Sequence, residues 1–144
     1  MHYQKEIIEI FSPLIEKFKL FPNSKDENTL ELAGAKSVIE IAVFFGDVYV
    51  SIKKSSESQK GIEPMVWAYL TGQLNYKNLK PISDQENITL KDKTLSRLKE
   101  EYSAIKMFCR ELLNGEFPDQ FDFEIQKKKL LEELNEHFEA ERKN

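Results

Sequence analysis

The sequence contains few of the residues that build catalytic and metal sites. There is one cysteine, Cys109, and there are two histidines, His2 and His137. A single cysteine cannot form an intramolecular disulfide, and one Cys with two distant His falls short of the four ligands of a structural zinc site. The five glycines stand singly, so glycine-rich loops that cradle phosphate groups are missing. We therefore expect a protein that is not an enzyme and has no catalytic residues, no metal and no cofactor.

Long hydrophobic runs are also missing. The longest runs cover residues 41–45 and 65–70, whereas a membrane-spanning helix needs roughly 20 apolar residues. Glu6 and Glu9 interrupt the apolar residues near the N-terminus, which argues against the hydrophobic region of a signal peptide. Together with the single cysteine, this composition predicts a cytoplasmic protein that does not bind membranes.

The charge balance is mildly acidic. The sequence has 21 basic and 25 acidic residues, which gives a net charge of -4 and argues against a nucleic-acid-binding protein. The cluster Lys127-Lys128-Lys129 would spread over about 200° of a helix surface, so we predict no nucleic-acid contact there. Residues 92–144 hold 13 of the acids and 10 of the bases, so three of the four units of negative charge lie in this part.

Length and periodicity predict one α+β domain over residues 1–144. Apolar residues between Ile7 and Phe18 recur at helical spacing and predict a helix over 3–20. Pro13 either kinks this helix or starts a new one with Ser12 as N-cap, and the continuous apolar face favours the kink. The turn-rich residues Phe21–Ser24 are expected to end it.

Alternating apolar residues then predict a three-stranded antiparallel meander. The strands are expected at Thr29–Ala33, 37–45 and 48–53, with Gly46-Asp47 as a two-residue hairpin turn. Ile88 and Leu90 could add a fourth strand. The hairpin turn sets the register, in which the expected pairs are Phe45 with Val48, Val43 with Val50, Ile41 with Ile52, Glu40 with Lys53, Phe44 with Tyr49 and, from the first strand, Leu30 with Ile39.

The remainder of the chain is predicted to be helical. A short helix should run from Pro64 to about Leu74. A long helix should follow with Asp92 as N-cap and Asn114-Gly115 as its stop, and the adjacent acids Glu100 and Glu101 should face solvent. Its inner stripe is Leu95, Leu98, Tyr102, Ile105, Cys109 and Leu112. A last helix over 122–141 should have Ile125, Leu130, Leu131, Leu134 and Phe138 on its inner face and pair with the long helix as an antiparallel helical hairpin.

Residues 115–124, which connect these two helices, combine four acids and three phenylalanines without a basic residue. In one interpretation, Phe117 and Phe123 pack as hydrophobic staples and Asp119 or Asp122 caps the last helix. In the other, the segment contacts a basic partner, because carboxylates steer the encounter and an exposed ring supplies a hot spot. The predicted partner-binding residues are Glu116, Phe117, Asp119, Phe121, Asp122 and Glu124.

The order of elements resembles that of small bacterial α+β proteins of the immunity type. The local resemblance is carried by Pro13-Leu14-Ile15-Glu16-Lys17-Phe18 and Leu112-Leu113-Asn114-Gly115-Glu116-Phe117. It implies a module that neutralises a cognate toxin by direct binding, and no residue role can be carried over because immunity proteins share no binding motif. Two alternatives are an adaptor that self-associates through the C-terminal hairpin and a small enzyme using His137 or Glu40. The sequence leaves the oligomeric state open between monomer and homodimer.

Overall fold

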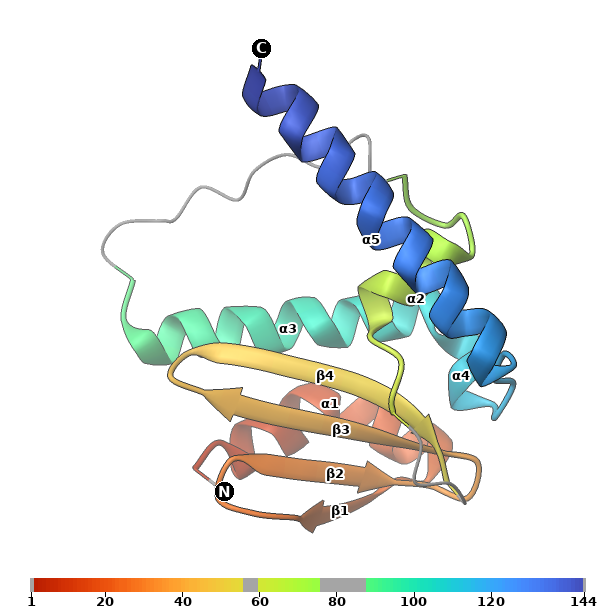
Figure 1. Ribbon diagram of the computed structural model, residues 1–144. Coiled ribbons are helices and arrows are strands. Elements are labelled where there is room, and N and C mark those ends of the chain that lie inside the picture. Colours follow the sequence, from red (N-terminus) through yellow and green to blue (C-terminus); the bar gives the residue numbers. More distant parts are fainter. Residues whose placement is uncertain (1, 56–59, 76–87, 144) are drawn as a thin grey trace.

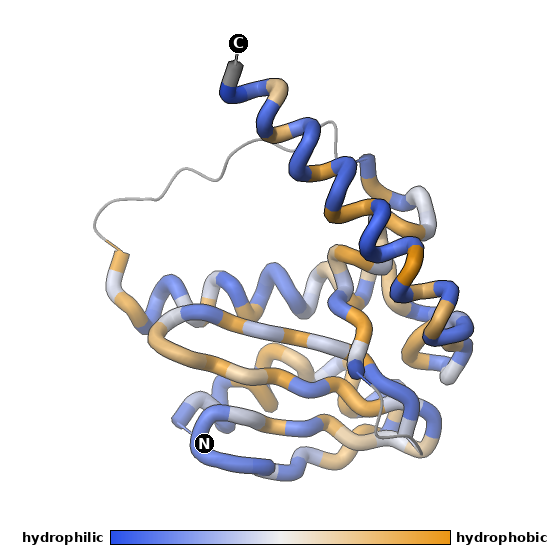
Figure 2. Tube along the Cα trace, viewed as in Figure 1, coloured by the Kyte–Doolittle hydropathy of each residue, from blue (hydrophilic) through white to orange (hydrophobic). Residues whose placement is uncertain are grey.

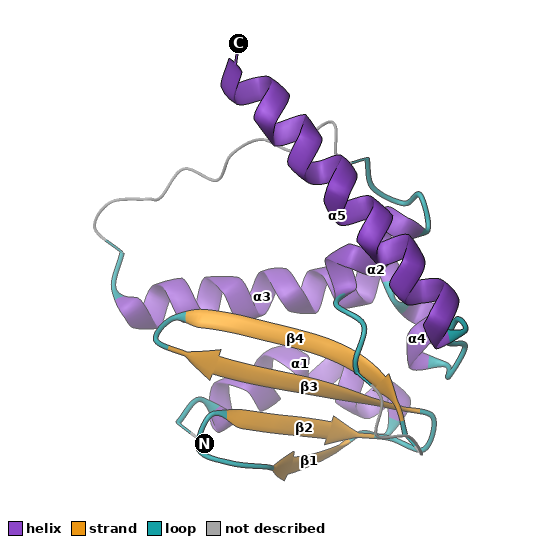
Figure 3. Cartoon of the chain, viewed as in Figure 1, coloured by secondary structure: helices purple, strands orange, loops and turns teal. Residues whose placement is uncertain are grey.

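The computed structural model describes residues 2–55, 60–75 and 88–143 (Figure 1). The chain has an α+β fold with an N-terminal helix, a four-stranded antiparallel sheet and C-terminal helices. The first helix and the long helix of residues 90–108 lie on one face of the sheet, while the helices of residues 64–70 and 120–143 lie beyond its last strand (Figure 3). The elements are α1 (Gln4–Phe18), β1 (Phe21–Ser24), β2 (Thr29–Ala33), β3 (Ser37–Phe44), β4 (Asp47–Lys54), α2 (Pro64–Leu70), α3 (Leu90–Phe108), α4 (Arg110–Leu113) and α5 (Gln120–Lys143).

The sheet contains the predicted meander and one more strand. Its strand order is β1-β2-β3-β4. The prediction of a turn at Phe21–Ser24 is wrong, because these residues form β1 and pair with β2. Pro22 can lie there because an edge strand leaves one side without ladder bonds. The alternative fourth strand at Ile88 and Leu90 is also wrong, since Leu90 begins α3.

The β3–β4 hairpin has the predicted buried face but a register shifted by two residues. The turn consists of Phe45 and Gly46, with φ angles of 47° and 85°. Positive φ at both central positions is typical of a type I′ turn, whose twist matches that of the strands. Because the shift is an even number, every side chain stays on its predicted face. The observed pairs include Val43 with Val48, Ile41 with Val50, Ile39 with Ile52 and, from β2, Leu30 with Ile41.

Two predicted side-chain pairs survive this shift as diagonal contacts. Lys53 Nζ lies 3.4 Å from Glu40 Oε2. The rings of Phe44 and Tyr49 lie 6.3 Å apart between their centroids. The outer face of the sheet therefore keeps an ion pair and an aromatic pair even though neither is directly opposite.

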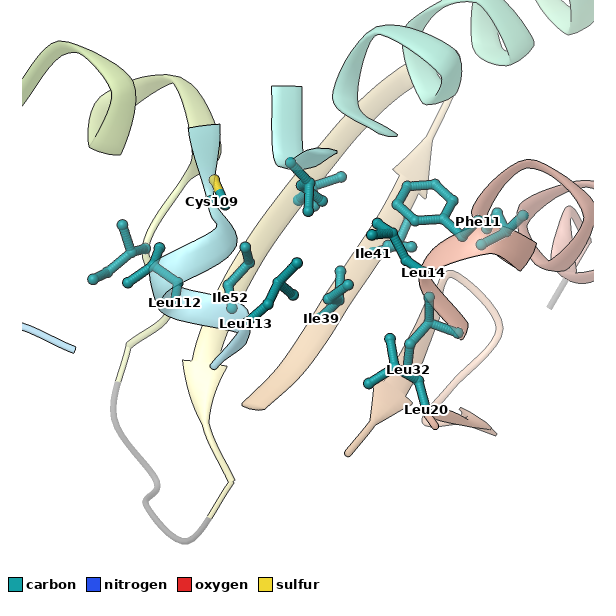
Figure 4. Close-up of a cluster of buried hydrophobic side chains, with 14 of the residues drawn as sticks. Phe11, Leu14, Leu20, Leu32, Ile39, Ile41, Ile52, Cys109, Leu112 and Leu113 are labelled. Carbon is teal, nitrogen blue, oxygen red and sulfur yellow. The ribbon is translucent and has the colours of Figure 1, made fainter. Parts of the chain in front are cut away.

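The core lies between α1, the inner face of the sheet and the α3–α4 region (Figure 4). α1 continues through Pro13, so a new helix starting at Ser12 is wrong. Phe11 and Leu14 of α1 point toward Ile41 of β3. Burial of each such side chain contributes about 1.5–3 kcal/mol of stability.

The apolar stripe of the long helix faces inward as predicted, with Leu95 and Tyr102 partly buried. Leu98, Ile105 and Cys109 are fully enclosed. The N-cap is Thr89, whose Oγ1 accepts a hydrogen bond from the Asp92 N–H at 3.1 Å, so the prediction of Asp92 is wrong. The helix is interrupted at Cys109 and continues as the short α4, which ends at Leu113, directly before the predicted stop at Asn114-Gly115.

The predicted helical hairpin does not form. α5 begins at Gln120 and packs against α2, and its C-terminal end points away from the sheet (Figure 1). Phe123 and Leu130 are buried, whereas Ile125, Leu131 and Phe138, expected on the inner face, are exposed. The physical reason is that α1, α2 and β4 already cover the inner stripe of α3. None of the helices among the described residues is long and apolar enough to cross a membrane.

The free edge of β4 is partly covered by the chain that leads into α2. Ile52 and Ile62 exchange two backbone hydrogen bonds, at 2.9 and 2.8 Å. Gly61 passes so close to Ser51 that a Cβ atom at position 61 would overlap with its side chain. Glycine is therefore required for this close approach.

Candidate partner-binding surface

Residues 115–124 leave α4 through a glycine turn and enter α5 through an aspartate cap. Gly115 adopts a φ of 83°, and the Glu116 N–H donates to the Glu111 carbonyl at 2.9 Å. Asp119 Oδ1 accepts from the Asp122 N–H at 3.1 Å, and its carbonyl accepts from the Phe123 N–H at 2.9 Å. Asp119 thus occupies the N-cap of α5, one of the two caps anticipated above, where a carboxylate is favoured by the helix dipole.

The three phenylalanines of this segment have different environments. Phe123 is buried and Phe117 packs against the core from the edge. Phe121 is 74% exposed. Because Phe117 and Asp119 hold the fold together, the predicted binding residues that are free to meet a partner are Glu116, Phe121, Asp122 and Glu124, all of them exposed.

Ile125 joins these residues, although periodicity placed it on the inner face. Phe121 and Ile125 are one helical turn apart, about 40° from each other around the axis. Phe123 and Leu130 lie on the opposite side of α5, where they pack inward. Figure 2 shows that α5 is mostly hydrophilic with separate hydrophobic positions. We call the set Glu116, Phe121, Asp122, Glu124 and Ile125 the Phe121 surface.

The Phe121 surface is negatively charged. Among the described residues, no ion pair involves Glu116, Asp122 or Glu124. Glu124 also borders a shallow hollow that Lys54 and Lys60 line, so nearby positive charge offsets it in part. Glu116 and Asp122 therefore give this surface most of its negative potential.

A second feature is a cavity of about 410 Å³ beside β4, which sequence reasoning missed. Glu101 lines it, and its Oε2 atom is buried without a hydrogen-bond partner in the part of the chain that the structure describes. Burial, together with the charges of Glu100 and Glu63, raises the pKa of Glu101 to about 7. The prediction that Glu101 faces solvent is wrong. Its position three residues after Leu98, at the flank of the buried stripe, is the signal that could have revealed it.

The alternative acid–base residues are not brought together. Glu40 lies on β3, where it shares Lys25 and Lys53 with Glu31 at distances of 3.2–3.6 Å. His137 lies near the end of α5, where its Nε2 is 3.2 Å from Glu141. In the part of the chain that the structure describes, no three His, Cys, Asp or Glu side chains gather where they could hold a metal ion.

Comparison of the chain with protein-family models, with curated proteins and with solved structures finds no match in any of the three. The function is therefore inferred from the chemistry of the described residues themselves.

Proposed function

We propose that the protein is a non-enzymatic module that binds a basic protein partner through the Phe121 surface. The observation that supports it is the 74% exposure of Phe121, which directly precedes Asp122 in a segment where Glu116 and Asp122 are exposed and form no ion pair within the described part of the chain. Leaving so large a ring in water forgoes the free energy of its burial, about 1.5–3 kcal/mol, which a partner that covers the ring would recover. Aromatic residues, phenylalanine included, are enriched in the cores of protein interfaces, which are bordered by a polar rim.

The charges around the ring suggest the chemistry of the partner. Carboxylates at the rim of an interface mainly accelerate association with a positively charged protein, and salt weakens this effect. The resemblance to immunity proteins makes a toxin domain the preferred candidate. The protein would then act as an inhibitor that neutralises a basic bacterial toxin domain by direct binding in the cytoplasm.

Self-association through the long helix has less support. Its inner stripe is buried inside the chain, so Leu98, Ile105 and Cys109 are not available to a second copy.

The test compares two matched double variants of α5. Phe121→Ser with Asp122→Lys changes the proposed surface, while Phe138→Ser with Glu139→Lys makes nearly the same chemical change near the other end of the helix. Asp119 is left intact because it caps α5. Each tagged protein is used to capture partners from cells at low salt, and affinity for any captured basic protein is then measured by surface plasmon resonance.

We expect the first variant to weaken binding about 30-fold or more, which corresponds to a hot spot of about 2 kcal/mol. The control variant should bind like the unmodified protein, and binding should weaken as salt is raised. Equal binding by both variants would contradict the proposal, as would a captured partner that is acidic.

A further inference from the structure

The cavity beside β4 has the size of a small-molecule site. Its volume of about 410 Å³ lies within the range of about 300–1,000 Å³ that is typical of such sites. Its walls come from β3 and β4, from residues 60–65, from α3 and from α5. The lining includes apolar side chains, among them Val48, Pro64 and Met65, and the ring of Tyr49.

Three carboxylates line this cavity, and two of them have partners. Glu40 Oε2 lies 3.4 Å from Lys53 Nζ. Glu63 Oε1 lies 3.4 Å from Lys127 Nζ. Glu101 Oε2 has no hydrogen-bond donor among the described residues, although the atom is buried. A buried acceptor without a donor is costly, so native proteins seldom leave one without a reason.

We propose that this cavity binds a small organic cation with a guanidinium group, which pairs with the carboxylate of Glu101 on the cavity wall. A guanidinium is planar and weakly hydrated, so it can enter a partly apolar cavity and stack on a ring such as that of Tyr49. A divalent metal ion would need several oxygen ligands, and Glu40 and Glu63 are engaged with lysines. Lys60 and Lys127, which also line the cavity, disfavour ligands with more than one positive charge.

The binding should depend on pH, because Glu101 must be ionised to attract a cation. With a pKa of about 7, Glu101 changes from mostly protonated at pH 6 to mostly ionised at pH 8. The affinity should therefore be several-fold higher at pH 8. The charged and titratable groups around Glu101 are Arg97, Glu100 and Cys109 from the α3–α4 region, Lys60 and Glu63 from the segment before α2, Glu40 and Tyr49 from the sheet, and Lys127 from α5.

The first experiment titrates the unmodified protein with n-butylguanidinium, followed by NMR chemical shifts and isothermal titration calorimetry. The neutral compound n-butylurea has nearly the same shape and serves as the control ligand. We expect saturable binding of n-butylguanidinium, with shifts at Glu101 and Tyr49, at least tenfold tighter than that of n-butylurea. Equal binding of the two compounds, or no saturable binding of n-butylguanidinium, would overturn the proposal.

The second experiment tests the role of Glu101. Glu101→Gln should weaken binding at least tenfold, and Glu16→Gln, at an exposed position of α1 that does not line the cavity, should leave it unchanged. In the unmodified protein, affinity that does not change between pH 6 and pH 8 would overturn the proposal even if Glu101→Gln failed to fold. The Phe121→Ser, Asp122→Lys variant should bind n-butylguanidinium normally, so this site can be tested separately from the partner-binding surface.

Discussion

The partly buried carboxyl of Glu101 should make the stability of the protein fall as pH rises. Its pKa in the folded protein is about 7 against an ordinary value of 4.5, because burial disfavours the charged form. A difference of this size corresponds to about 3 kcal/mol, and partial access of solvent to the side chain reduces this to about 1–2 kcal/mol. The stabilisation is complete below pH 4.5 and is lost as pH rises through 7.

Glutamine has the shape of the protonated glutamate and cannot ionise. Glu101→Gln should therefore match the unmodified protein in stability near pH 5 and exceed it by about 1–2 kcal/mol at pH 8. The free energy of unfolding can be followed by the fluorescence of Trp67, the single tryptophan, which is buried. Urea is the denaturant of choice, because guanidinium chloride would supply the cation proposed to bind the cavity.

Glu16→Gln is the control, because Glu16 is exposed on α1 and its charge does not affect the pKa of Glu101. Its stability should follow that of the unmodified protein at each pH. The reasoning would be refuted if Glu101→Gln changed stability by the same amount at pH 5 and pH 8, or if it lowered stability at pH 8.

Three further predictions concern single positions. Phe45→Asn should raise stability by about 0.5–1 kcal/mol, because Phe45 is 92% exposed and has a φ of 47° that asparagine adopts more easily. Thermal unfolding measures the change, and an unchanged or lower Tm would argue against strain at the turn. Asp119→Ala should cost about 1 kcal/mol in urea unfolding through loss of the cap, and Asp122→Ala clearly less. The Cys109 thiol should not react with Ellman's reagent at pH 8 until the protein is unfolded, because it is fully buried and its pKa is raised to about 12; rapid labelling of the folded protein would contradict its burial.

The sheet was predictable to the level of its faces. Alternation assigns Ile39, Ile41 and Ile52 to the inner face in any register that differs by an even number of residues. The turn position was not predictable in the same way, because Gly46 can occupy either place in a two-residue turn. Phe45 in a left-handed conformation goes against its intrinsic preference. β1 was missed because Pro22 resembles a turn residue and is tolerated at a sheet edge.

The helices show the limit of periodicity. The stripe of α3 is regular because it meets a continuous inner layer, and its burial was predicted correctly. α5 has apolar residues on more than one side, so periodicity alone could not decide whether Leu130 or Ile125 faces α2. The exposure of Phe121 could not be predicted for the same reason, because it depends on which face of α5 packs against α2. Glu101 lies at the boundary of the α3 stripe. A side chain at such a position can be either exposed to solvent or buried, so periodicity does not decide between the two.

The two edges of the sheet bear on how the protein behaves at high concentration. An exposed edge strand offers unpaired N–H and C=O groups to strands of other molecules and is a common starting point for aggregation. Here β1 has four residues and contains Pro22, which lacks an N–H, while the edge of β4 is bonded to Ile62 and packed against α3. Both edges of the sheet are thus poor templates for a further strand. This disfavours aggregation through strand pairing at high protein concentration.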